Sequence, residues 1–240
     1  MEKKGITGKV ALVTGGTRGI GSAISKVLYD LGATVIITGT NCDYVPRDGY
    51  EYMCVDFSNK NSLSEFVNRV SEKQIDILVN NAGVNQIGPI SELSVVDFER
   101  VQQVNVTAPF MLCQVVLPNM RKKKWGRIIN ISSIWGKISK AHRAPYSASK
   151  FAIDGLTAAI SAEVAIDGVL VNSVSPGFID TELTRSILGV EELSRLAMQV
   201  PMQRMGTIEE VAKFVGWLGG MENTYISGQN IAIDGGFTRV

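Results

Sequence analysis

Cysteine and histidine are scarce in this sequence. Its 240 residues include 3 cysteines, Cys42, Cys54 and Cys113, and 1 histidine, His142. An odd number of cysteines with no C-x-x-C pair argues against a disulfide framework and fits a reducing compartment. A single histidine all but excludes a histidine-based zinc site or a Ser-His-Asp triad. We therefore expect neither a metal site nor a disulfide scaffold.

Long apolar runs and excess charge are also lacking. No run approaches the roughly 18 apolar residues that a membrane span needs, and the first apolar run, "VALV", is too short for a signal peptide. The net charge of +1 gives no general attraction to nucleic acid or to an anionic membrane. We expect a cytoplasmic protein that binds neither.

Short runs rich in β-branched residues alternate with segments of helical spacing along the whole chain. The runs lack apolar/polar alternation, as in strands buried on both faces of a parallel sheet. The pattern predicts one doubly wound α/β domain of the Rossmann type over residues 1–240, with a seven-stranded parallel sheet and helices on both faces. The expected strands are 9–15, 33–39, 51–56, 75–83, 126–132, 169–177 and 229–236, and the expected helices are 19–31, 60–73, 94–123, 145–166 and 207–219.

The connection between the second and third expected strands is unusually short. Only residues 41–50, "NCDYVPRDGY", are available, whereas a parallel crossover normally needs about a dozen residues with a helix. Pro46, Asp48 and Gly49 favour turns. We therefore expect a loop in place of the helix.

The glycine-rich stretch "TGGTRGIG", residues 14–21, follows the first strand and opens the first helix. Glycines at 15, 19 and 21 allow the backbone to approach a pyrophosphate, whose charge the helix N-terminus favours. The spacing is neither G-x-G-x-x-G nor that of a P-loop.

The nucleotide predicted for this cradle is NADP(H) rather than NAD(H). NAD-binding folds usually place an acid at the tip of the second strand, and here that strand ends "TGTN". Arg18 lies in the cradle and could meet a 2′-phosphate. Asp43 weakens the inference, because the short loop could bring it back to the ribose.

A tyrosine and a lysine stand four residues apart in "YSASK", residues 146–150. In a helix Tyr146 and Lys150 are neighbours on one face. The nearby ammonium is expected to lower the pKa of the phenol, which ordinarily lies near ~10. The pair is therefore a candidate general acid/base.

Asn105 has a rationale of its own. Pro109, four residues later, lacks an N–H, so in a helix the carbonyl of Asn105 loses its usual partner and could hold a water. Alternatively, Pro109 simply kinks or starts a helix.

Taken in order, "TGGTRGIG", "NNAG" (80–83), a Ser-Ser ending the fifth strand, "YSASK" and "SPGFIDT" (175–181) resemble the short-chain dehydrogenase/reductase family, from about residue 6 to 238. Within it the chain is most similar to β-ketoacyl-carrier-protein reductases, in "VPMQRMG" (200–206) and "SGQNIAIDGG". The missing helix is the departure from the family pattern, and it affects Thr40 most.

The resemblance implies functional residues at matching positions. The catalytic residues would be Asn105, Ser133, Tyr146 and Lys150, with Ser132 second to Ser133. The residues that bind the cofactor would be Gly15, Thr17, Arg18, Gly19, Ile20, Gly21, Thr40 at the 2′-phosphate, Asp56 at the adenine, Asn81, Ala82, Gly83, Tyr146, Lys150, Pro176, Gly177, Ile179 and Thr181. An oligomer, homodimer or homotetramer, is implied through the helices of 94–123 and 145–166.

The expected activity is NADP(H)-dependent hydride transfer between the nicotinamide and a carbonyl or secondary alcohol, and the favoured substrate is a small-molecule or carrier-linked 3-oxoacyl thioester. Alternatives are a sugar, polyol or nucleotide-sugar oxidoreductase, and a non-catalytic NADP-binding regulator.

Segment 178–205 is expected to cover the site, and Trp135 either stacks on substrate or belongs to the core. A basic rim could recruit an anionic substrate, or its charges could simply be solvated; its members are Lys137, Lys140, His142, Arg143, Arg185, Arg195 and Arg204.

Overall fold

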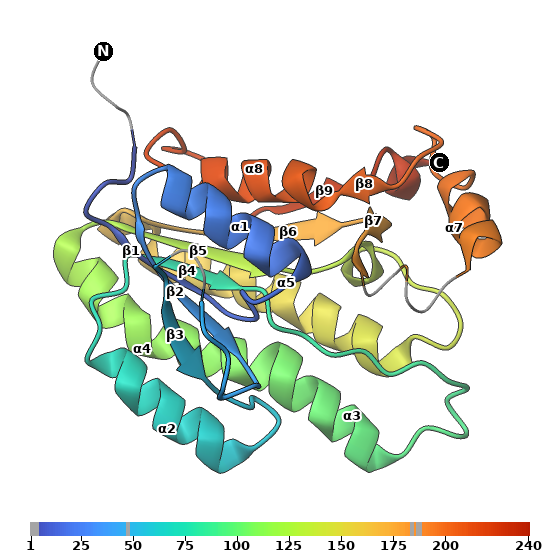
Figure 1. Ribbon diagram of the computed structural model, residues 1–240, viewed down its shortest axis with the longest axis horizontal. Coiled ribbons are helices and arrows are strands. Elements are labelled where there is room, and N and C mark those ends of the chain that lie inside the picture. The colour runs from blue at the N-terminus through green and yellow to red at the C-terminus, as the bar shows by residue number, and fades with distance from the viewer. Residues whose placement is uncertain (1–4, 47–48, 183–184, 186–188) are drawn as a thin grey trace.

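The computed structural model describes residues 5–46, 49–182, 185 and 189–240. Seven parallel strands form one sheet in the order β3-β2-β1-β4-β5-β6-β9 (Figure 1). The strands are β1 (Val10–Val13), β2 (Thr34–Gly39), β3 (Glu51–Cys54), β4 (Ile77–Asn80), β5 (Gly126–Ile131), β6 (Val169–Pro176) and β9 (Asn230–Ile233). A two-stranded ribbon, β7 (Ile179–Asp180) with β8 (Gly206–Thr207), lies beyond β6. The expected α/β fold class with a seven-stranded parallel sheet is confirmed.

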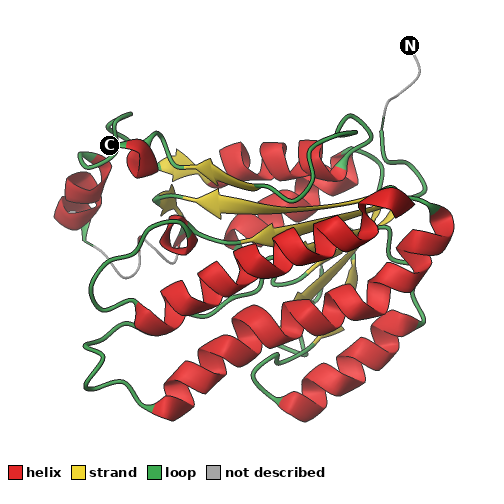
Figure 2. Cartoon of the chain, turned by 180° about the vertical axis from the view of Figure 1, so that it is seen from behind, coloured by secondary structure: helices red, strands yellow, loops and turns green. Residues whose placement is uncertain are grey.

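Helices cover both faces of the sheet. Helices α1 and α8 pack on one face, whereas α2, α4 and α5 cover the other, which Figure 2 shows from behind. The main helices are α1 (Gly19–Asp30), α2 (Lys60–Ser71), α3 (Val95–Gln102), α4 (Ala108–Lys123), α5 (Ala144–Val164), α7 (Val190–Ala197) and α8 (Ile208–Gly219).

Successive side chains of a strand point to opposite faces of the sheet, so the core consists of two layers. Leu12 of β1 packs in the layer beneath α2 and α4, whereas its neighbours Ala11 and Val13 pack in the layer beneath α1 and α8. All three are fully buried. Both faces of the strand therefore need apolar residues, which explains the continuous apolar runs.

The helix starts follow local chemistry. The Asn59 side chain caps α2 by accepting hydrogen bonds from the backbone N–H groups of Asn61 and Ser62. Thr207 and Glu210 form a capping box at the start of α8. These caps fix where the helices begin after their strands.

The helix expected over 94–123 is not one continuous α-helix. Residues Gln103–Thr107 form a π-helical turn between α3 and α4. Pro109 cannot donate to the carbonyl four residues earlier, and the Ala108 N–H bonds instead to Gln103 O, five residues back. The irregular turn carries Asn105.

The connection between β2 and β3 contains no helix among its described residues, as expected. It does contain a disulfide, between Cys42 and Cys54, whose Cα atoms are 5.0 Å apart. The cysteine count argued against a disulfide framework, and the structure nevertheless contains this one disulfide, with Cys113 as the free cysteine. An odd number of cysteines does not exclude a disulfide between two of them, and these two flank the short loop.

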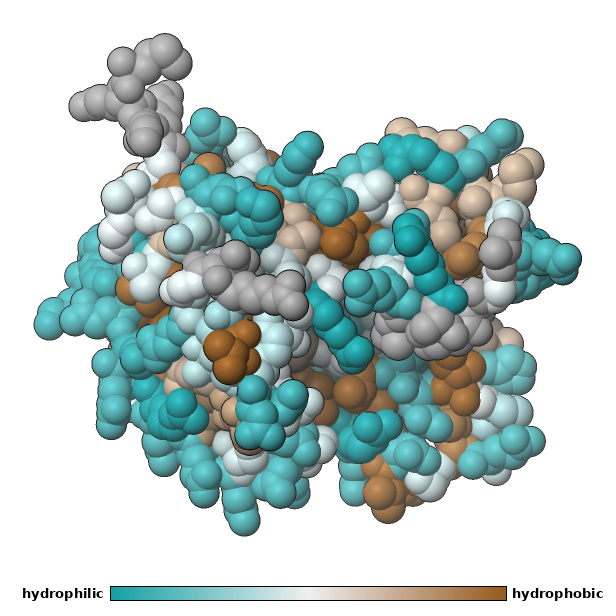
Figure 3. All heavy atoms as spheres, in the orientation of Figure 1, coloured by the Kyte–Doolittle hydropathy of each residue, from teal (hydrophilic) through white to brown (hydrophobic). Residues whose placement is uncertain are grey.

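The face drawn in Figure 3 is mostly hydrophilic, with apolar side chains in separate patches. No described helix combines the length and the apolar character needed to cross a membrane. Within the same residues, no cluster of three histidine, cysteine or acidic side chains is arranged to hold a metal ion.

Candidate active site

The strand order reverses between β1 and β4, which neighbour each other in the middle of the sheet. The carboxyl ends of these strands form the crevice where open α/β sheets bind ligands. Thr14 ties the two ends together: its hydroxyl accepts hydrogen bonds from the backbone N–H groups of Asn81 and Ala82, both at 2.9 Å. The Asn81 side chain returns a bond to Thr14 O at 2.9 Å. The glycine-rich segment and "NNAG" thus form one wall.

The three glycines of the predicted cradle have different environments. A Cβ on Gly21 would lie 2.3 Å from Gly15 O, and one on Gly15 would lie 3.1 Å from Ala82 Cα, so both allow close backbone packing. Gly19 has a φ of +55° and open space where a Cβ would stand. The open side lies at the N-terminus of α1, which favours an anion. This cradle fits a pyrophosphate of the predicted cofactor.

The predicted adenosine end lies at the tips of β2 and β3. Thr40 and Arg18 are exposed, and Arg18 makes no ion pair with any described residue. The Asp56 carboxylate accepts hydrogen bonds from the N–H and hydroxyl of Ser58, at 2.9 and 2.7 Å. Thr17 packs against Gly39 so closely that a Cβ there would lie 2.9 Å from Thr17 Cγ2. The structure brings these positions to one edge of the sheet.

Ser133 and Tyr146 face each other closely enough for the Ser133 hydroxyl to lower the pKa of the Tyr146 phenol. Ser133 follows β5, and its Oγ also accepts from the Trp135 N–H at 3.2 Å. The preceding Ser132 turns toward α5 instead, where its hydroxyl donates to Lys150 O at 3.3 Å. The geometry therefore supports Ser133 over Ser132 as the partner of the tyrosine.

Tyr146 lies in the first turn of α5, three residues after Arg143. Burial raises the pKa of its phenol, and the Ser133 hydrogen bond and the Arg143 charge lower it in part. The cation that lowers this pKa is thus Arg143, whereas the sequence suggested Lys150. The Lys150 Nζ lies 5.5 Å from the centroid of the Tyr146 ring.

Lys150 is only 5% exposed. Its ammonium donates to Ile131 O at 2.8 Å, and burial lowers its pKa to about 8. A Cβ on Gly83 would lie 3.7 Å from Lys150 Nζ and 3.4 Å from Asn105 Oδ1. The absence of a side chain at Gly83 therefore leaves room beside both groups, which fits the predicted ribose of the nicotinamide half.

Asn105 is buried beneath this region and is fully engaged through its side chain. Its Oδ1 accepts from the Val84 N–H at 2.9 Å, and its Nδ2 donates to Val84 O and to Ser149 Oγ at 2.9 and 3.0 Å. The Ser149 hydroxyl in turn donates to Tyr146 O at 2.7 Å. Asn105 thus connects the "NNAG" segment to the helix of Tyr146.

The segment that follows β6 forms the opposite wall of the crevice. The Gly177 N–H donates to Ile233 O at 2.9 Å, and a Cβ there would lie 2.8 Å from Asp234. Ile179 is buried in β7, and Thr181 follows directly. Pro176 ends β6, so the four predicted residues lie in one run at the carboxyl edge.

An aromatic cluster borders this edge. Trp135 is 8% exposed and makes edge contacts with Phe178 and Phe237, at centroid distances of 6.3 and 6.2 Å. Lys140 lies over the same indole, with Nζ 5.5 Å from its centroid. Trp135 is therefore a buried residue in the wall of the crevice, and only a small part of its side chain is exposed.

The expected basic rim is neutralised in part. Lys137 donates to Asn230 O at 2.7 Å, and the arginines of the covering segment each bind a carboxylate. By contrast, Arg143 has no carboxylate partner within the described chain, and its buried Nε lacks a hydrogen-bond partner. The three neutralised arginine pairs are Arg185 with Asp180, Arg195 with Glu192 and Arg204 with Glu210.

Sequence reasoning missed three contributors to the site. Thr14 was seen only as the residue before the glycines, although a hydroxyl at the end of β1 could have suggested a link to β4. Ser149 lies inside "YSASK" but was not given a role. Arg143 was counted among the rim charges, and its spacing of three from Tyr146 was the available signal.

A switch-point crevice, a glycine cradle at a helix N-terminus and a Ser–Tyr–Lys cluster beside it define the class of dinucleotide-binding oxidoreductases. The model of the short chain dehydrogenase family matches residues 9–191. The chain belongs to the short-chain dehydrogenase/reductase family.

Named relatives extend over nearly the whole chain. It is 37% identical over 240 residues to the 3-oxoacyl-[acyl-carrier-protein] reductase FabG of Vibrio cholerae, covering 96% of this chain and 98% of the relative. It is 39% identical over 248 residues to FabG of Aquifex aeolicus, with the same coverage. The structure of a gluconate 5-dehydrogenase from Burkholderia cenocepacia, in complex with NADP and tartrate, matches with a TM-score of 0.91, 28% identity, and coverage of 99% of this chain and 98% of that one.

Proposed function

We propose that the protein is an NADP(H)-dependent oxidoreductase that interconverts a ketone and a secondary alcohol. The observation that carries the proposal is the convergence of Ser133, Tyr146 and Lys150 beside the cradle of 14–21. When bound, NADP(H) would supply or accept the hydride at C4 of the nicotinamide. The FabG relatives and the NADP-bound neighbour support this assignment.

The roles of the side chains follow from the charge that develops on the substrate oxygen. In reduction the Tyr146 phenol donates a proton to that oxygen, and in oxidation the same group removes it. The Ser133 hydroxyl hydrogen-bonds the oxygen and holds the carbonyl toward the cofactor. The Lys150 ammonium adds positive charge in a buried site, where its field is strong.

The proposed proton path continues through Asn105. Its backbone carbonyl lies in the π-helical turn, where an irregular hydrogen-bond pattern allows a water to bind. From there protons would reach Lys150 and Tyr146. The side chain of Asn105 meanwhile holds the segment at Val84 in register with α5.

The substrate proposed first is a 3-oxoacyl thioester. Two FabG relatives, 37% and 39% identical, support it. The buried aromatic wall of Trp135, Phe178 and Phe237 suits an acyl chain better than a polyol.

The test combines cofactor titration with turnover. NADPH and NADH are titrated, and absorbance at the nicotinamide band is then followed with acetoacetyl thioester. We expect tighter binding of NADPH and turnover of the thioester. Arg18→Ala should remove the preference for NADPH, with exposed Arg69→Ala as the matched control. Tighter binding of NADH would overturn the role of Arg18 and favour Asp43.

A hydroxy acid or sugar acid is the second candidate, and one observation favours it. Arg143 has a buried, unpartnered Nε one helical turn from Tyr146. A guanidinium that close to the reacting carbonyl suits a carboxylate on the substrate itself. The gluconate 5-dehydrogenase neighbour was solved with tartrate, a dicarboxylate.

Comparing Arg143→Gln with the parent distinguishes the two candidates. If the substrate is a keto acid, the variant should raise KM for it by about 10-fold or more and leave KM for NADPH unchanged. If the substrate is a thioester, KM for acetoacetyl thioester should stay within about twofold.

We further infer a cytoplasmic homo-oligomer that forms through α4 and α5. Phe110 and Phe151, one from each helix, are 49% and 47% exposed. Large apolar side chains left exposed on a surface mark places where a partner can bind. Sedimentation of Phe110→Lys together with Phe151→Lys should give a smaller species than the parent protein.

A further inference from the structure

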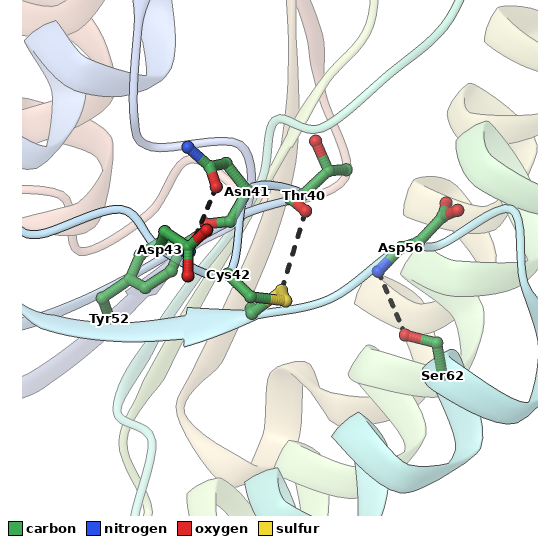
Figure 4. Close-up of a disulfide and its surroundings, with 8 residues drawn as sticks. Thr40, Asn41, Cys42, Asp43, Tyr52, Asp56 and Ser62 are labelled. Carbon is green, nitrogen blue, oxygen red and sulfur yellow. Dashed lines mark hydrogen bonds between the residues drawn. A yellow bond between two sulfur atoms is a disulfide. The ribbon is translucent and has the colours of Figure 1, made fainter.

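The Cys42–Cys54 disulfide joins the two segments that carry the predicted adenosine-end residues. Thr40 stands two residues before Cys42, and Asp56 stands two residues after Cys54. The Sγ of Cys54 lies 3.7 Å from Thr40 O, along the dashed line in Figure 4. The crosslink therefore adds a covalent tie between the two halves of one subsite, next to the end of the β2–β3 ladder.

The other contacts of the described part of this loop are noncovalent: Tyr44 packs on Tyr52 at a centroid distance of 5.0 Å, and the Tyr44 N–H donates to Asn41 O at 3.2 Å. The β2–β3 ladder ends at the pair Gly39 and Cys54, followed by the Val55 N–H to Gly39 O bond at 2.9 Å. Beyond that point the Asn41 backbone carbonyl accepts from the Tyr52 hydroxyl at 2.6 Å. No helix covers the connection in its described part, so the disulfide is the covalent brace where a helix would otherwise pack.

We propose that Cys42 and Cys54 are positioning residues for the adenosine end of the cofactor site, so that cofactor affinity depends on whether they are oxidised. This inference rests on the proposed NADP(H) function. The oxidised loop restrains Thr40 and Asp56 by a covalent bond as well as by the ladder, whereas the reduced loop keeps only the noncovalent contacts and loses more conformational entropy on binding. The disulfide form is therefore the tighter binder.

The pair is accessible to thiol exchange. Cys42 is exposed and Cys54 is half-buried, whereas Cys113 lies on the buried face of α4, where burial raises the pKa of its thiol to about 12. Cys113 therefore does not compete for exchange. Disulfides in reducing compartments, where they occur, are usually transient or redox-sensing.

The exchange reaction balances with a small-molecule disulfide, such as oxidised glutathione, as the oxidant. The Cys42 thiolate attacks one sulfur of that disulfide and releases the first thiolate. The Cys54 thiolate then attacks the Cys42 sulfur and releases the second. The two protein S–H protons end on the two small thiols, so one protein S–S bond replaces the small disulfide. A dithiol reverses the reaction.

The experiment measures binding of 2′,5′-ADP, which contains the adenosine end alone, so turnover is not required. Full-length protein is treated with oxidised glutathione or with dithiothreitol, and peptide mapping establishes the state of Cys42 and Cys54. Calorimetry should show that reduction raises the Kd of 2′,5′-ADP about 10-fold, equal to about 1.4 kcal/mol. The Kd of nicotinamide mononucleotide should not change.

Variants separate the crosslink from other effects of the reductant. Cys42→Ser and Cys54→Ser should bind 2′,5′-ADP with the weaker affinity in both treatments. The matched control Cys113→Ser should respond to reduction like the parent protein. Thermal melts of each variant identify any loss of folding.

Three results would overturn the proposal. They are an equal Kd in the mapped oxidised and reduced forms, a Cys42→Ser variant that binds as tightly as the oxidised protein, and failure of oxidised glutathione to link Cys42 to Cys54. Equal Kd values with intact thioester turnover would leave the proposed function standing. Redox-dependent binding of 2′,5′-ADP without turnover would sink the substrate assignment alone.

Discussion

Asn105 and Val84 are joined by two hydrogen bonds of 2.9 Å, one to the N–H and one to the carbonyl of the same backbone unit. The pair links the π-helical turn to the strand-end segment that follows β4. Because Asn105 also donates to Ser149, the helix of Tyr146 is held in the same network. Its effect on stability can be measured apart from catalysis.

Replacing Asn105 by alanine should lower the free energy of unfolding by about 2–4 kcal/mol, because the Val84 N–H and carbonyl lose their partners in a buried setting. Urea unfolding followed by circular dichroism measures the change. The exposed Asn68→Ala variant serves as the control and should stay within about 0.5 kcal/mol of the parent protein. An unchanged midpoint for Asn105→Ala would contradict the structural role.

Replacing Tyr146 by phenylalanine should reduce kcat by about 10²–10⁴-fold, because the ring stays and only the proton donor is lost. The affinity for NADPH should change little. Steady-state rates and a fluorescence titration of NADPH test both statements, with the 96% exposed Tyr225→Phe as control. A variant that binds NADPH and retains full turnover would remove Tyr146 from the chemistry, and a parent protein that binds without turnover would favour a regulator.

Two glycines of the cradle should respond differently to alanine. Gly21→Ala places a Cβ 2.3 Å from Gly15 O, so the fold must shift and the melting temperature should fall by several degrees or more. Gly19→Ala adds a Cβ in open space, so the variant should fold, at a cost of about 1 kcal/mol for its left-handed φ. It should nevertheless lose affinity for NADPH about 10-fold, since the methyl group occupies space for the pyrophosphate. Equal effects of the two variants on melting and binding would contradict this division.

Lys150 should leave a pH signature in stability. Its folded pKa of about 8 lies below the ordinary lysine pKa of 10.5, so at intermediate pH the unfolded chain binds a proton that the folded chain does not. Stability therefore rises as pH increases through this window. Relative to Lys150→Met, the free energy of unfolding of the parent protein should rise by on the order of 2 kcal/mol between about pH 8 and 9.5. Urea titrations at several pH values test this, and parallel curves for the two proteins would refute it.

The sequence was sufficient to predict the sheet because apolar runs without alternation require burial on both faces. It also predicted the missing helix, since residues 41–50 are too few for one. The same reasoning failed at 94–123, where one periodic segment contains a π-helical turn. Helical periodicity does not register a single extra residue in a turn, although Pro109 marked the place.

The candidate site shows the same division. Tyr146 and Lys150 could be paired from their spacing of four on one helical face, whereas Ser133 followed from the resemblance to the family. The pKa of Tyr146 could not be predicted from the sequence, because it depends on burial and on the charge of Arg143. The turn before α5 sets where the Arg143 side chain lies. The Cys42–Cys54 bond was missed because counting cysteines ignores where strands place them.

The paired arginines of the covering segment have a consequence for how substrate arrives. Arg185, Arg195 and Arg204 each neutralise a carboxylate within the same region, so their fields cancel over a few ångströms. These three arginines therefore add little to the long-range steering of an anionic substrate, and replacing any one of them together with its carboxylate should leave the ionic-strength dependence of the association rate constant nearly unchanged. Selection among anions then falls to short-range contacts inside the crevice, after the encounter has occurred.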